Sequence, residues 1–241
     1  MKKYFNWTNI RLVFMLVFLC VLFSFTSHKN AQRKLVKIDA EFQGKERLFV
    51  THESVNKLLI EKKRDASSIQ KLELDLNSLE NKLNSHDMIA KSEVFVTIDG
   101  VLKTVVRQKT PIARVFDRGV SYYIDSEGGM MPLSEMNTAR VPLITGQIEA
   151  DDLVQLSNVL RKIHEDDFLQ KNIISVEVSP SKSLKLKNRT HDYSIDFGKM
   201  INVDKKFRNY KAFYQKTVHD SLATKYSSIN LKFTQQVVCT K

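Results

Sequence analysis

The chain has 241 residues, of which 42% are hydrophobic and 27% charged, enough for one membrane anchor and two small domains. Its 7 Gly and 4 Pro exclude a collagen-like chain and argue against a long flexible linker. The net charge of +11 comes from Lys and Arg that are spread along the chain and mixed with acids. Without an Arg-rich helix or zinc-finger spacing, this charge indicates a cationic surface and predicts no nucleic-acid partner.

An apolar run near the N-terminus predicts a transmembrane helix. Residues 10–27 read IRLVFMLVFLCVLFSFTS, with no charge between Leu12 and Phe25. As a helix, about 18 residues rise roughly 27 Å, close to the thickness of the bilayer hydrocarbon. Tyr4 and Trp7 precede the run, where amphipathic aromatic rings favour the headgroup layer. We predict a single span over residues 10–27 after a cytoplasmic N-terminus of residues 1–9.

Cleavage of this run as a signal peptide is the main alternative. A signal-peptidase site needs small residues at the −3 and −1 positions, and bulky Phe25 and Lys29 occupy −3 in the two candidate sites. A lipoprotein site at Cys20 fails because Leu19 precedes it. Basic residues flank the run on both sides, so their count does not decide its orientation. Cys20 and Cys239 lie at opposite ends of the chain, and no disulfide between them is predicted.

Residues 35–109 have the pattern of a small strand–helix–helix–strand–strand module. Residues 36–42 alternate as a strand, and Thr51 is a suitable N-cap for the first helix. The second amphipathic segment places Leu72, Leu76, Leu79 and Leu83 on one face. Asp99-Gly100 then predicts a hairpin between strands 90–98 and 101–109. This order resembles a POTRA module, a class that binds peptide segments, often by adding a strand at a sheet edge.

Residues 110–241 predict a second, mixed or antiparallel β domain with flanking helices, so the fold class of the chain is α+β. The elements that we expect are strands at 122–125, 173–178, 184–187, 193–197 and 228–238, and helices at 149–165 and 203–225.

Several motifs in fixed order resemble the FtsQ/DivIB family of bacterial cell-division proteins. Residues 72–134 contain an amphipathic helix, a hairpin and a Pro-Ile-Ala-Arg step, followed by Tyr-Tyr-Ile-Asp and Gly-Gly-Met-Met-Pro. Residues 141–146 resemble the "VPxITG" element of the family, and the resemblance covers nearly the whole chain except residues 179–202. It implies that the bulk of the chain lies outside the cytoplasmic membrane.

The same resemblance implies a partner-binding edge near the C-terminus. The residues at 230–233 match an Asp-Leu-Arg-Tyr-like step, and residues 235–238 would form the edge that recruits the FtsB/FtsL pair. An unpaired edge exposes N–H and C=O groups that accept another strand. The alternative is a last strand that its own sheet covers. The predicted partner-binding residues are Asn230, Leu231, Lys232, Phe233, Thr234, Gln235, Gln236, Val237 and Val238.

Two patterns suggest chemistry, and neither predicts a site. Residues 164–167 read His-Glu-Asp-Asp, but four consecutive residues at a helix end usually face solvent, so we predict no metal. Ser-x-x-Lys occurs three times, at Ser54, Ser68 and Ser179, but the sequence lacks the Lys-Thr-Gly partner that penicillin-binding enzymes also need. We therefore predict no catalytic residue, no cofactor and no small-molecule substrate.

The predicted function is that of a non-enzymatic divisome scaffold. By resemblance, the protein would be a single-pass protein of the cell inner membrane at the division septum, with a cytoplasmic N-terminus and a periplasmic bulk. It would bind the periplasmic parts of FtsB and FtsL and link early to late division components. Two alternatives stay open: a POTRA-bearing envelope assembly or secretion factor, and a membrane-anchored cell-wall enzyme.

Overall fold

The computed structural model describes residues 7–31, 33–44, 49–60, 69–117, 119–149, 152–219 and 223–241. The chain divides into two compact units. The first unit contains Met1–Glu46 and Val50–Gln108, and the second contains Arg47–Phe49 and Lys109–Lys241. Each unit has its own hydrophobic core.

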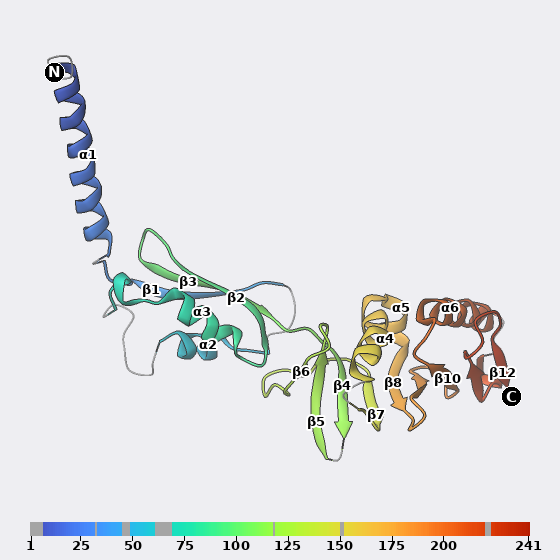
Figure 1. Ribbon diagram of the computed structural model, residues 1–241. Helices are drawn as coiled ribbons and strands as arrows, with labels where there is room; N and C mark the ends of the chain where they lie inside the picture. The colour runs from blue at the N-terminus through green and yellow to red at the C-terminus, as the bar shows by residue number, and fades with distance from the viewer. Residues whose placement is uncertain are drawn as a thin grey trace. The chain divides into compact units, whose positions relative to one another are not determined.

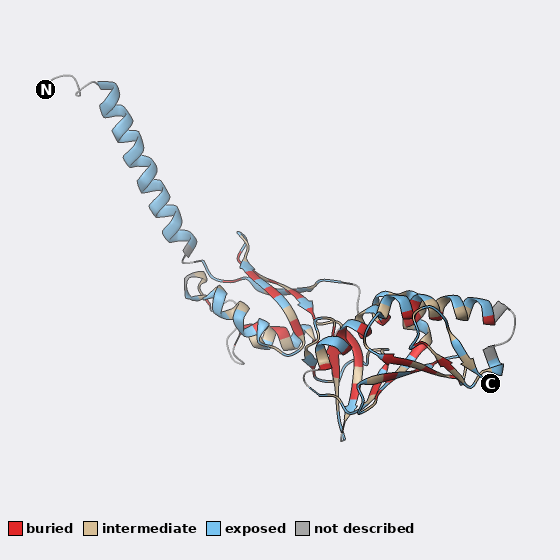
Figure 2. Cartoon of the chain, turned by 45° about the vertical axis from the view of Figure 1, so that its right-hand side comes forward, coloured by how far each residue is buried: buried red, intermediate tan, exposed pale blue. Residues whose placement is uncertain are grey.

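The N-terminal helix α1 runs over Trp7–Ala31, so it extends beyond the predicted span at both ends. Its side chains are exposed along the described length (Figure 2), apolar ones such as Phe14 and Phe23 included. Among the described residues, α1 is the one helix that is long and apolar enough to cross a membrane. Apolar side chains that find no protein partner are stable in lipid, and α1 therefore indicates membrane anchoring.

The first unit places two helices on one face of a three-stranded sheet (Figure 1). The sheet order is β1-β3-β2, in which β3 pairs with β1 in parallel and with β2 as an antiparallel hairpin. This confirms the predicted order of strand, helix, helix, strand, strand. The elements are β1 (Lys37–Phe42), α2 (His52–Leu59), the 3-10 turn η2 (Lys71–Glu73), α3 (Leu76–Asn84), β2 (Ile89–Val96) and β3 (Val101–Gln108).

Capping side chains decide where the two helices of this unit begin. The Thr51 hydroxyl accepts the N–H of Ser54 at 3.0 Å and starts α2, as the sequence predicted. Asp75 caps α3 by accepting the N–H of Ser78 at 3.0 Å. The predicted leucine stripe is thereby divided between η2 and α3; Leu83 is fully buried, and Leu76 and Leu79 are half-buried against the core.

The second unit is built on a nine-stranded mixed sheet of order β12-β11-β10-β9-β8-β7-β4-β5-β6. Neighbouring strands pair in parallel at β4–β7, β7–β8 and β10–β11, and antiparallel elsewhere. The strands are β4 (Pro111–Asp117), β5 (Val120–Asp125), β6 (Met130–Met131), β7 (Leu143–Gly146), β8 (Ile173–Val178), β9 (Ser183–Asn188), β10 (Ser194–Lys199), β11 (Ser228–Asn230) and β12 (Val238–Thr240).

Three helices cover one face of this sheet, as Figures 1 and 2 show. They are α4 (Leu153–Glu165), α5 (Asp167–Asn172) and α6 (Val203–His219), and the 3-10 turn η4 (Ala223–Lys225) follows α6. The helix predicted at 149–165 begins at Leu153, and the N–H of Asp152 before it bonds the carbonyl of Glu149. The predicted helix at 203–225 ends at His219.

The prediction of one long last strand over residues 228–238 is wrong. The chain forms two short strands, β11 and β12, joined by residues 231–237. The Asn230 side chain accepts the backbone N–H of Lys232 at 2.9 Å, a local bond that turns the chain out of the strand direction. Asn209 of α6 then donates to the Thr234 carbonyl at 3.0 Å and holds this connection.

A buried tyrosine pair joins α6 to the sheet and predicts a pH effect. The hydroxyls of Tyr193 and Tyr210 lie 3.2 Å apart, and Asn188 donates to the Tyr210 hydroxyl at 2.7 Å. Burial raises the pKa of both tyrosines above 10.0. Above about pH 10 the unfolded chain loses tyrosine protons that the folded chain retains, so the free energy of unfolding falls as pH rises.

Replacement of Tyr193 by Phe is expected to reduce that alkaline loss, because one raised pKa is removed. Urea unfolding of the full chain in mild detergent from about pH 9 to 11, about one unit on either side of the tyrosine pKa of the unfolded chain, measures it. Burial lowers the pKa of Lys206, which acts in the opposite direction but equally in both proteins. Identical alkaline slopes for the two proteins would contradict the prediction.

Candidate protein-binding edge

The C-terminal strand β12 lies at one edge of the nine-stranded sheet. It pairs antiparallel with β11, with Ile229 opposite Cys239, and no described strand pairs with its other side. The N–H of Ser227 also donates to the Thr240 carbonyl at 2.8 Å, which extends the contact past β11. The outward N–H and C=O groups of β12 are therefore placed to bond a further strand.

The predicted partner-binding residues do not all lie on this edge. Asn230 ends β11, which has β10 on one side and β12 on the other, whereas Val238 begins β12. Leu231 is fully buried, and its N–H donates to the Asp196 carbonyl at 2.9 Å. Of the predicted set, only Val238 belongs to the edge strand.

The other predicted residues form the connection between β11 and β12. Lys232, Gln235 and Gln236 are exposed, and Phe233 keeps 52% of its surface accessible. Thr234 is half-buried, and Val237 packs against the core. An exposed phenyl ring beside the edge can contribute apolar contact to a bound chain.

Sequence reasoning missed the last two residues of the edge strand, Cys239 and Thr240. The signal was present, because residues 237–240 read Val-Val-Cys-Thr and are rich in β-branched side chains. Cys239 is half-buried, and burial raises the pKa of its thiol.

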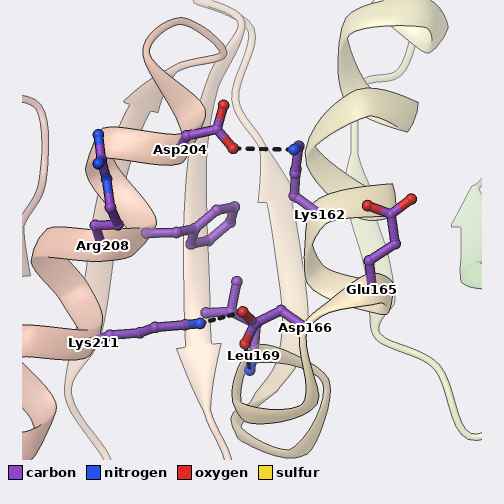
Figure 3. A pocket seen from close by; sticks show the side chains of 8 residues that line it. Lys162, Glu165, Asp166, Leu169, Asp204, Arg208 and Lys211 are labelled. Atoms are coloured by element: carbon purple, nitrogen blue, oxygen red, sulfur yellow. Dashed lines mark hydrogen bonds and ion pairs between the residues drawn. The ribbon is translucent and has the colours of Figure 1, made fainter.

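A cavity of about 450 Å³ lies between the end of α4 and the helix α6. Figure 3 shows that its walls carry charges of both signs, with an ion pair between Lys162 and Asp204 (Nζ to Oδ1, 3.2 Å) and another between Lys211 and Asp166. Leu169 and Phe207 contribute its apolar lining. These pairs tie α4 and α5 to α6.

The carboxylate of Asp166, part of the His-Glu-Asp-Asp run at residues 164–167, forms hydrogen bonds and an ion pair within the second unit. Its Oδ1 atom accepts the N–H groups of Phe168 and Leu169, both at 3.1 Å, and so caps α5. Burial alone would raise the pKa of Asp166, but bonds from Lys211 and these two N–H groups outweigh it and lower the pKa. The described residues contain no cluster of three or more metal-ligating side chains.

Two of the three Ser-x-x-Lys lysines pair with carboxylates. Lys57 pairs with Glu53 at 2.6 Å, and Lys182 pairs with Asp152 at 2.9 Å. Ser179 donates its hydroxyl proton to the Ser183 carbonyl at 3.0 Å. Ser68 lies outside the described residues. The Lys57 pair lies along helix α2, and the Ser179 bond lies in the turn between β8 and β9.

Comparison with known proteins decides the family. A family model described as "FtsQ/DivIB, C-terminal related" matches residues 110–240, more than half of the chain. The chain belongs to this FtsQ/DivIB-related family. Membership indicates a role in cell division, and FtsQ/DivIB proteins are in general non-enzymatic division proteins.

The chain is also similar to a solved structure of a DivIB protein. That structure is the major extracytoplasmic domain of the trans isomer of the bacterial cell-division protein DivIB from Geobacillus stearothermophilus. The identity is 14%, the match covers 32% of this chain and 69% of that chain, and the TM-score is 0.25. A search of curated proteins gives no significant match.

Proposed function

We propose that this FtsQ/DivIB-related protein is a non-enzymatic divisome scaffold that captures an extended segment of FtsB- and FtsL-type division proteins at β12. The captured segment adds a tenth strand to the nine-stranded sheet and so links early to late division components. The observation that carries the proposal is the position of β12 at the end of the sheet, with β11 as its partner strand. Sheet extension of this kind gives affinity through main-chain bonds.

The short edge suits a controlled interaction. β12 has three residues, and Lys241 follows it directly. Short edge strands with a nearby lysine resist indiscriminate pairing, so such an edge favours a partner that supplies further contacts. Phe233, exposed on the adjoining connection, is placed to supply one of them.

We also propose the topology of the chain. Residues 1–9 lie in the cytoplasm, α1 crosses the inner membrane, and both units lie in the periplasm at the division septum. Residues 35–109 form a POTRA module, and residues 110–241 form the FtsQ-type β domain. The apolar helix and the family match support this arrangement.

Site-specific photo-crosslinking in dividing cells tests the proposal. The full chain would carry a photoreactive amino acid at Val238, which is 41% exposed, or at the more accessible control position Val154 of α4, which is 71% exposed. We expect a crosslink to an FtsB- or FtsL-type protein from Val238 and none from Val154, with the adducts identified by mass spectrometry. Adducts that join Val238 to unrelated proteins, or partner adducts from Val154 alone, would exclude β12 as the binding edge.

A further inference from the structure

The C-terminal part of the second unit carries most of the net charge of the chain. Residues 203–241 contain eight Lys or Arg residues and two Asp residues, a net charge of +6 out of +11 in 39 of 241 residues. One of the eight, Lys206, is buried and donates to the carbonyls of Phe197 and Lys199 at 2.9 and 2.7 Å. The other seven lie on α6 or next to β11 and β12 in the chain.

Three of these lysines flank the two ends of the β11–β12 pair. Lys225 ends η4 and precedes Ser227, whose N–H bonds the Thr240 carbonyl, and Lys241 follows Thr240. Lys232 follows β11 at the opposite end of the pair, where its side chain lies close to Gly198 of β10. These cations therefore stand near both ends of the candidate edge.

Most of these cations have no ion-pair partner among the described residues. Within the part of the chain that the structure describes, none of Lys205, Arg208, Lys216, Lys225, Lys232 and Lys241 forms an ion pair. Asp204, one of the two acids in residues 203–241, is already paired with Lys162. Asp196 lies one strand further from the edge than β11, opposite Asn230.

We infer that the segment bound at β12 is acidic, with Asp or Glu residues flanking the added strand. This inference rests on the proposed function and names the chemical class of its partner. Exposed charge of one sign gathered at a binding site attracts an oppositely charged partner over about a Debye length and speeds its association. Once this electrostatic attraction has brought the segment close, the main-chain hydrogen bonds of β12 hold it.

Binding kinetics of the full chain in nanodiscs of uncharged lipid test this inference. The probe is the purified extracytoplasmic pair of FtsB- and FtsL-type proteins from the same bacterium. One variant carries Lys225→Gln, Lys232→Gln and Lys241→Gln. The matched control also loses three positive charges, but in the first unit, through Lys82→Gln, Lys103→Gln and Arg107→Gln. A third variant ends at Val237.

We expect the association rate constant of the edge variant to be about tenfold below wild type at about 0.1 M salt, where the Debye length is about 10 Å. At about 1 M salt the difference should shrink below about twofold, because the Debye length is then about 3 Å. The control should stay within about twofold of wild type at both concentrations.

The other outcomes separate the two ideas. Wild-type kinetics in the edge variant, with binding lost in the variant that ends at Val237, would overturn the acidic partner and leave β12 as the edge. Wild-type binding by the variant that ends at Val237 would instead overturn the proposed function. A charge effect that appears only in nanodiscs containing anionic lipid would overturn the inference in favour of a membrane surface.

Discussion

Truncation of the chain after Val237, which removes β12, is expected to weaken binding of the FtsB- and FtsL-type partners by at least about 100-fold. A factor of 100 corresponds to about 2.8 kcal/mol, which a few ladder hydrogen bonds of about 1 kcal/mol each supply. The truncation removes every backbone group of β12, whereas Ile229 and Leu231, which are buried in the full chain, belong to residues that it retains. Equilibrium binding of the full and truncated chains in nanodiscs measures the effect.

A chain that ends at Thr240 is the control for β12, because it retains the strand and loses only Lys241, one of the three cations whose removal together is expected to slow association about tenfold. Circular dichroism and urea unfolding must show that both truncated chains keep a folded second unit. A folded chain ending at Val237 that binds within about threefold of wild type would disprove strand addition at β12.

The sequence-based and structure-based positions of the edge can be separated by experiment. The sequence predicted pairing through residues 235–238, whereas the strand runs over Val238–Thr240. Gln235→Ala and Gln236→Ala shorten exposed side chains on the connection and should change affinity less than about twofold. A tenfold loss of affinity in either variant would instead indicate that the partner binds the connection between β11 and β12.

Replacement of Gly146 by Ala is expected to destabilise the second unit by about 3 kcal/mol or more. A Cβ atom at Gly146 would overlap the carbonyl oxygen of Val178, its neighbour in the β7–β8 pair. Backbone of two adjacent strands cannot move apart without breaking ladder bonds, and the φ of +104° adds strain to any side chain. Urea unfolding of the full chain followed by circular dichroism measures the loss.

Gly119 offers a control that separates the two causes. Its φ of +83° is also positive, but a Cβ atom there would meet nothing within 4 Å. Gly119→Ala should therefore cost only the conformational strain, about 1–2 kcal/mol. Equal losses in the two variants would show that the contact with Val178 is unimportant.

The sequence alone was sufficient to predict a helix, strand or turn where a local signal and a burial pattern agree. The apolar run predicted α1 because lipid demands a continuous stretch of about 20 apolar residues. The alternating residues at 173–178 predicted β8, and Asp99-Gly100 predicted the turn between β2 and β3, because period and turn chemistry are properties of neighbouring residues. The motif order pointed to the FtsQ/DivIB family, which the family match confirms.

The sequence by itself thus determined the class of the protein: an apolar anchor, α+β elements and the family to which they belong. Only the tertiary structure decided where the candidate edge lies. The break after β11 depends on contacts from distant segments, the bond of Leu231 to Asp196 and that of Asn209 to Thr234, which no local pattern contains. Strand order is likewise a property of the whole sheet, because whether a strand has one neighbour or two depends on residues far away in the chain.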